Sequence, residues 1–228
     1  MLQALLKGKL SREQENLEDM LTSNVLGLFR YLPAKEGGLP FLTLARLEDG
    51  HAAYEFSGVD VEDVTIELWP QCYPQGLGLV EPDALIEIRT RGGEEYCIFV
   101  EVKLHSQKSQ HETGVLMDQL AREWFAALDY VQGTKKIPHL LFVTANSSYP
   151  IDEVQESMRE FMQKMPDHPK MRCSWLSWCD VPRAFCDSRS LALQDISALC
   201  ERLDLRPFSG IRCPGEIQIK WCYGGNAR

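Results

Sequence analysis

The stretch that decides the fold extends from Pro82 to Lys103 and has the sequence PDALIEIRTRGGEEYCIFVEVK. Ala84–Ile88 and Tyr96–Lys103 are rich in β-branched and aromatic residues, which favour strands. Between them, Arg91–Glu94 carries two adjacent glycines, and glycine adopts the positive φ angles that tight turns require. The stretch therefore predicts two antiparallel strands joined in a hairpin.

Helices and further strands flank the predicted hairpin. Apolar spacing predicts helices near 11–32, 115–131, 152–165 and 190–203, and apolar runs predict strands near 59–68, 138–145 and 171–178. Ser11 followed by Gln14 forms a capping box that begins the first helix. The tail, 207–228, is expected to add an edge hairpin or to be poorly ordered. Together these elements predict an α/β fold, a central mixed sheet with flanking helices.

The composition is that of a globular protein. With 228 residues, 44% hydrophobic and 25% charged, the chain is too apolar for a disordered protein. No apolar run approaches the ~20 residues that span a bilayer. Residues 1–10 have no signal-peptide pattern. We therefore expect a cytoplasmic protein that contacts no membrane.

The eight cysteines include no C-x-x-C pair, which disfavours a zinc knuckle. We expect reduced thiols that pack as small apolar groups. A metal or redox role for Cys213 and Cys222 is the alternative. Three tryptophans, Trp69, Trp175 and Trp178, are expected to fill the core rather than to stack on bases.

The net charge of −9 bears on the choice of partners. Phosphates dominate the affinity of free-standing DNA-binding modules, so such modules are normally basic. The acidity argues against tight autonomous binding of nucleic acid, yet it suits an enzyme that gathers metal ions with carboxylates. We therefore expect a second copy of the chain, or a partner protein, to help hold any DNA substrate.

The hairpin carries three residues capable of chemistry, Asp83, Glu101 and Lys103. Residues two apart on a strand point to the same face, so Glu101 and Lys103 project side by side. The hairpin returns the end of the second strand to the start of the first, which brings Asp83 near Glu101. Converging acids are costly unless a cation neutralises them, and Mg²⁺ prefers oxygen ligands. A bound metal that activates water can hydrolyse a phosphodiester, with Lys103 to orient that water or help deprotonate it and to offset the charge on the phosphate.

These residues resemble the signature of the PD-(D/E)XK nucleases, in which Pro82–Asp83 and Glu101–Lys103 flank a hairpin. Glu15–Pro33 looks like the first helix of bacterial nuclease-like proteins of this superfamily, some of them from phage-defence loci. The residues around Gln119 resemble the glutamine-bearing helix of its RecB-like branch. The resemblance covers about residues 11–180.

The resemblance implies a restriction-endonuclease-like fold with an αβββαβ core over residues 11–190, extended by a helix and tail over 191–228. It also implies cleavage of DNA with Mg²⁺, for which Mn²⁺ would substitute, in anti-phage defence or DNA processing. The resemblance also implies a role for each site residue. Asp83, Glu101, the carbonyl of Val102 and Glu18 (or Glu15, one turn away) would bind the metal. Lys103 would be the catalytic lysine, and Gln119 would lie beside the site.

The chain departs from the RecB-like pattern at one position. That branch has a tyrosine four residues after the glutamine, whereas this chain has Glu123, followed by Trp124. The substrate-end preference of the branch is therefore not implied. His105 and Lys108, in the loop after the lysine, could contact phosphates, with an ordinary solvated loop as the alternative.

Two other functions compete with a DNA nuclease. A nuclease-like fold without activity could serve as an interaction subunit, which the acidic charge favours. A hydrolase of RNA or nucleotides would use the same metal chemistry. The first alternative depends on whether the carboxylates converge in space.

Overall fold

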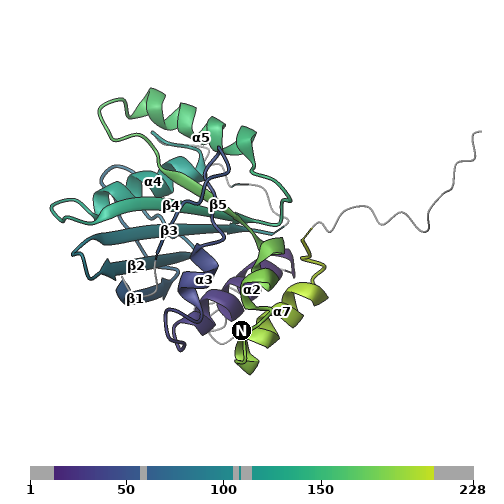
Figure 1. Ribbon diagram of the computed structural model, residues 1–228. Helices are drawn as coiled ribbons and strands as arrows, with labels where there is room; N and C mark the ends of the chain where they lie inside the picture. The colour runs from purple at the N-terminus through teal and green to yellow at the C-terminus, as the bar shows by residue number, and fades with distance from the viewer. Residues whose placement is uncertain (1–12, 57–60, 105–107, 109–114, 208–228) are drawn as a thin grey trace, which may run out of the picture.

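A five-stranded mixed sheet forms the centre of the computed structural model, which describes residues 13–56, 61–104, 108 and 115–207 (Figure 1). Its strands lie in chain order: β1 (Val61–Leu68), β2 (Ala84–Thr90), β3 (Glu95–Lys103), β4 (Ile137–Thr144) and β5 (Cys173–Ser177). The pairings β1–β2 and β2–β3 are antiparallel, whereas β3–β4 and β4–β5 are parallel. The expected α/β class with a mixed sheet is confirmed.

The predicted hairpin is formed by β2 and β3. Its register pairs Ala84 with Val100 and continues to Arg89 opposite Glu95. Gly93 turns the chain with a φ of 85°, a conformation that glycine adopts without steric cost. Both strands are slightly longer than the sequence pattern indicated, because the ladder extends to the turn.

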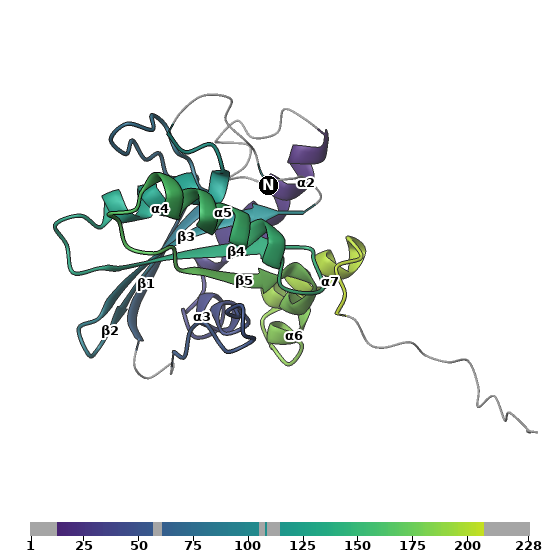
Figure 2. The same cartoon turned by 90° about the horizontal axis from the view of Figure 1, so that it is seen from above.

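Helices cover both faces of the sheet (Figures 1 and 2). One face packs against α2 (Glu13–Phe29), α3 (Gly38–Leu42), α6 (Val181–Phe185) and α7 (Leu191–Arg202), and the other against α4 (Gln119–Tyr130) and α5 (Ile151–Lys164). Alternate residues of β3 enter the two cores: Ile98 and Val100 on the first face, Cys97 and Phe99 on the second. Burial on both faces explains why β3 is apolar almost throughout.

The C-terminal helix belongs to the same core as the sheet. Leu193, Ile196 and Cys200 of α7 lie in the cluster that also contains Ile98 and Val100. The tail beyond residue 207, for which an edge hairpin or disorder was expected, lies outside the described residues. In the part of the chain that the structure describes, no helix has the length and apolar character needed to cross a bilayer.

Some element boundaries differ from those predicted. The helix expected from 115 begins instead at Gln119, because the Asp118 side chain caps it by accepting a hydrogen bond from the Ala121 N–H at 3.1 Å. The first helix ends at Phe29 rather than near Leu32, and the capping box at Ser11 lies outside the described residues.

The short helices α3 and α6, together with the 3₁₀ turn Trp178–Asp180, were not predicted. They have five residues or fewer, so they contain too little of the chain to show helical periodicity. All three tryptophans expected in the core are buried: Trp69, Trp175 and Trp178.

Candidate functional site

The candidate site lies where β2 begins and β3 ends. Continuing the register by one step from the Ala84–Val100 pair places Asp83 opposite Glu101. Directly opposed residues of an antiparallel pair point to the same face. The Asp83 Oδ2 also accepts a hydrogen bond from the backbone N–H of Val102 at 2.8 Å, which fixes this carboxylate against β3.

A strained tryptophan holds the other oxygen of Asp83. The indole Nε1 of Trp69 donates to Asp83 Oδ1 at 3.3 Å, and the Trp69 backbone N–H donates to the Asp83 carbonyl at 3.0 Å. Trp69 has a φ of 50°, in the left-handed region that bulky residues rarely enter and that costs of order 1–3 kcal/mol. Trp69 fills the core as predicted, but its second role, orienting Asp83, was missed.

Lys103 connects acids from two elements. Its Nζ lies 2.6 Å from Glu101 Oε1 and 3.5 Å from Glu18 Oε1, which comes from α2. The other oxygen of Glu18 accepts from the backbone N–H of Leu104 at 2.7 Å. The structure therefore brings Glu18 to the site as predicted, whereas the side chain of Glu15, the alternative acid, lies outside the described residues.

The charge of Lys103 is set by these acids. Burial disfavours the ammonium, but the carboxylates of Glu101, Glu18 and Asp83 outweigh burial and raise the pKa of Lys103 above its usual range. Lys103 is therefore a cation at neutral pH. In this arrangement it can stabilise negative charge, but it cannot accept a proton.

The first turn of α4 completes the cluster. The Gln119 Nε2 donates to Glu101 Oε1 at 2.5 Å, which brings the predicted glutamine into the site. Glu123 lies four residues later on the same helix face, and its carboxyl group is close enough to that of Glu101 to interact with it directly. Glu123 is 2% exposed, and its Oε2 has no hydrogen-bond partner among the described residues.

From the sequence, Glu123 was noticed only as a departure from a family pattern. A stronger signal was present in the helix itself. Glu123 lies between Leu120, Trp124 and Ala127, which are all buried, so an acid occupies the apolar stripe of α4. An acid that faces the core needs a functional or pairing explanation.

Burial and mutual repulsion make the acids of the cluster hard to ionise. Burial, followed by the Glu101 charge, raises the pKa of Asp83. Burial, followed by the Glu123 charge, raises the pKa of Glu101. Burial raises the pKa of Glu123 to about 7. The acids therefore retain protons at pH values where free carboxyl groups have lost them.

The donor chemistry of the cluster suits a hard divalent cation. Carboxylate oxygens and the carbonyl at Val102 are the ligand types that Mg²⁺ and Mn²⁺ take, and the unpartnered Glu123 Oε2 is an oxygen that a cation would satisfy. Within the described ranges, no three His, Cys, Asp or Glu side chains are already arranged as a metal-binding group. Instead, Lys103 and Gln119 both contact Glu101 Oε1.

Lys108 is not placed as a phosphate contact. Its Nζ donates to Asp118 Oδ2 at 2.6 Å, to the Glu153 carbonyl at 2.9 Å and to Ser157 Oγ at 2.8 Å. These bonds use all three donors of the ammonium and tie the N-terminus of α4 to α5. His105, the other residue expected to meet phosphates, lies outside the described residues.

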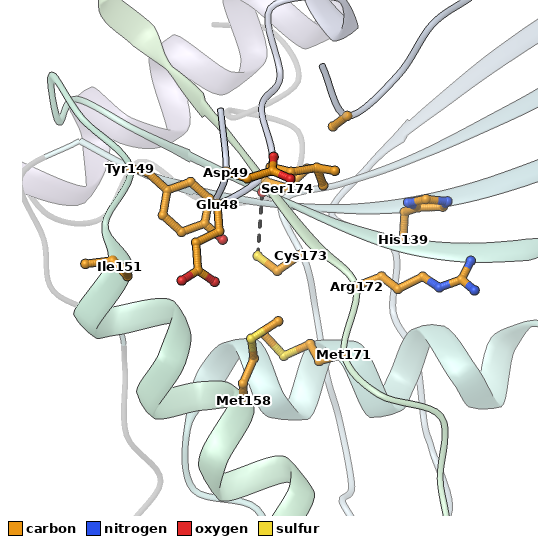
Figure 3. Close-up of a pocket in the computed structure, with 12 residues that line it drawn as sticks. Glu48, Asp49, His139, Tyr149, Ile151, Met158, Met171, Arg172, Cys173 and Ser174 are labelled. Atoms are coloured by element: carbon orange, nitrogen blue, oxygen red, sulfur yellow. Dashed lines mark hydrogen bonds between the residues drawn. The ribbon is translucent and has the colours of Figure 1, made fainter. Parts of the chain in front are cut away.

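A separate cavity of about 740 Å³ lies beside β5 and α5 (Figure 3). Tyr149, Met158 and Met171 line it, as do His139 and Cys173. Burial lowers the pKa of His139 to about 4 and raises the pKa of the Cys173 thiol to about 12, so at neutral pH the first is uncharged and the second is not a thiolate. These lining residues therefore offer no activated nucleophile, and the carboxylate cluster is the better candidate site.

The chain matches no protein-family model, no curated protein and no solved structure. The assignment of the site therefore depends on the geometry of Asp83, Glu101, Lys103, Glu18, Gln119 and Glu123.

Trp69→Phe tests the orientation of Asp83. The change keeps an aromatic ring but removes the indole N–H, so we expect a loss of about 1 kcal/mol of unfolding free energy beyond that of the control. The control is Trp178→Phe, because Trp178 is equally buried and its Nε1 has no partner among the described residues. Urea unfolding measures both, and equal losses would show that the Trp69–Asp83 bond contributes nothing.

Glu123→Gln tests the buried acid through the pH dependence of stability. Glu123 keeps its proton up to about pH 7 in the folded protein, whereas the unfolded chain releases it near 4.5. Protonation therefore stabilises the wild-type fold below pH 4.5, and this contribution is lost as pH rises through 7. Between these limits the variant should gain up to roughly 3 kcal/mol relative to wild type. Urea unfolding across pH 4–8 measures this difference, and a difference independent of pH would contradict the buried acid.

Proposed function

We propose that the chain is a restriction-endonuclease-like nuclease that hydrolyses DNA phosphodiester bonds with the help of Mg²⁺ or Mn²⁺. One observation carries the proposal: Glu101 and Lys103 of β3 meet Asp83 and the α2 acid Glu18 in a single, largely buried cluster. The element order supports it, because α2, three antiparallel strands, α4 and the parallel strand β4 come in the order of the αβββαβ core, with the short helix α3 inserted after α2.

The cation would be held by Asp83, Glu101 and the Val102 carbonyl, with Glu18 nearby. Bound there, it would supply Lewis acidity to a phosphate oxygen and lower the pKa of a bound water. The residues that surround these ligands keep them in place. Val102 N–H and the Trp69 indole orient Asp83, and Gln119 orients Glu101.

Lys103 has a defined task in this proposal. Because Glu101 and Glu18 hold it as an ammonium, Lys103 presents a fixed positive charge in a partly buried site. Such a charge stabilises the negative charge that develops on the phosphate more strongly than it would in water. We therefore assign Lys103 to charge stabilisation and orientation, and we do not assign it the role of general base.

An interaction subunit without activity is the second candidate. Both Lys103 and Gln119 contact Glu101 Oε1. The oxygen that would bind a metal therefore already has two protein partners. The net charge of −9 also disfavours a free-standing DNA-binding surface. Cleavage assays can separate this candidate from a DNA nuclease and from an RNA or nucleotide hydrolase. The substrate panel contains plasmid, linear and single-stranded DNA, RNA and nucleotides.

Lys103→Ala tests the catalytic proposal. Removing the fixed charge should lower the rate of plasmid cleavage in Mn²⁺ at least about 100-fold, the size of effect seen when a single electrostatic donor is removed. Lys136→Ala is the control, because Lys136 forms a similar Lys–Glu pair with Glu87 away from the site. Cleavage by Lys103→Ala at the wild-type rate would remove the mechanism, and a wild-type protein inactive on the whole panel would favour the interaction subunit.

We also propose that a second copy or a partner protein helps to hold DNA, since the acidic chain repels phosphates. Light scattering after size-exclusion chromatography at ~0.15 M salt should show a dimer, or a monomer that binds DNA poorly without its partner. A monomer that cleaves DNA efficiently under these conditions would contradict this proposal.

A further inference from the structure

We infer that Glu123 is a ligand of the divalent cation, which would add to the site a carboxylate from α4. The inference rests on the proposed function, because it concerns the same cation. It also goes beyond the family resemblance, which gives this position a tyrosine and assigns it no metal-binding role.

The unpartnered oxygen of Glu123 is the first argument. The side chain is 2% exposed, and no described residue donates a hydrogen bond to its Oε2. Nearby Arg122 acts on Glu123 electrostatically, while its guanidinium donates a hydrogen bond to the Leu79 carbonyl at 3.1 Å. A buried carboxylate oxygen without a donor is costly, and a cation would remove that cost.

The contact with Glu101 is the second argument. Glu123 comes from α4 and Glu101 from β3, yet their carboxyl groups lie close enough to interact directly. Two acids do not approach so closely unless something positive lies between them. A divalent cation coordinated by both carboxylates would fill that place.

The charge of the surrounding cluster is the third argument. Asp83, Glu101, Glu123 and Glu18 are close enough to act on one another or on Lys103 electrostatically, and Lys103 forms ion pairs with Glu101 and Glu18. One ammonium therefore lies among four carboxyl groups. A divalent cation shared by Glu101 and Glu123 offsets most of the remaining charge where burial is greatest.

Isothermal titration of the purified full-length protein with MnCl₂ tests the inference. We expect Glu123→Gln to bind Mn²⁺ at least tenfold more weakly than wild type. Glu87→Gln, the matched control, should bind it like wild type, because Glu87 pairs with Lys136 and takes no part in the cluster. Asp83→Asn, which removes a ligand of the proposed site itself, should also bind weakly.

Each outcome distinguishes the two proposals. If Glu123→Gln binds Mn²⁺ like wild type while Asp83→Asn does not, the role of Glu123 is overturned and the proposed metal site stands. If wild type itself takes up no Mn²⁺ at millimolar concentration, the proposed function fails, and this inference fails with it. Circular dichroism checks folding, and Glu123→Met, with a side chain of similar size, replaces the glutamine variant if that variant does not fold.

Discussion

Burial of carboxylates around one ammonium is the constraint on which this molecule depends. Lys103 Nζ lies 2.6 Å from Glu101 Oε1 in a part of the protein where Glu101 itself is 1% exposed. Ionised groups removed from water must be neutralised by opposite charge or by protons. The raised pKa values of Asp83, Glu101 and Glu123 show that Lys103 supplies only part of that compensation.

The fold brings these groups together from three directions. The β2–β3 register places Asp83 opposite Glu101, α2 reaches the end of β3 with Glu18, and α4 on the other face contributes Gln119 and Glu123. Each group is also tied to the backbone or to a neighbour, as in the bond from Val102 N–H to Asp83. Rigid support of this kind is what a metal-binding site requires of its surrounding residues.

The hairpin and its three polar residues were predictable because they depend on local rules. Strand periodicity puts Glu101 and Lys103 on one face, and a glycine turn returns the chain to Asp83. Glu18 and Gln119 required the family resemblance, since their arrival at the site depends on helix packing that periodicity does not determine.

Other features could not be predicted because they depend on tertiary contacts. Trp69 was recognised as a core residue, but only the folded chain shows its φ of 50° and its bond to Asp83. Lys108 lies in a stretch of sequence rich in polar residues, and nothing local indicates that Asp118 and Ser157 take up its donors. The importance of Glu123 follows from the burial of α4, which places an acid among apolar neighbours.

A crystal structure of the protein soaked in MnCl₂ tests the central claim most directly. The account predicts an anomalous difference peak about 2.0–2.3 Å from carboxylate oxygens of Asp83 and Glu101, with Lys103 displaced from its contact with Glu101 Oε1. A fully soaked crystal with no peak at the cluster, and with Lys103 still against Glu101, would contradict it.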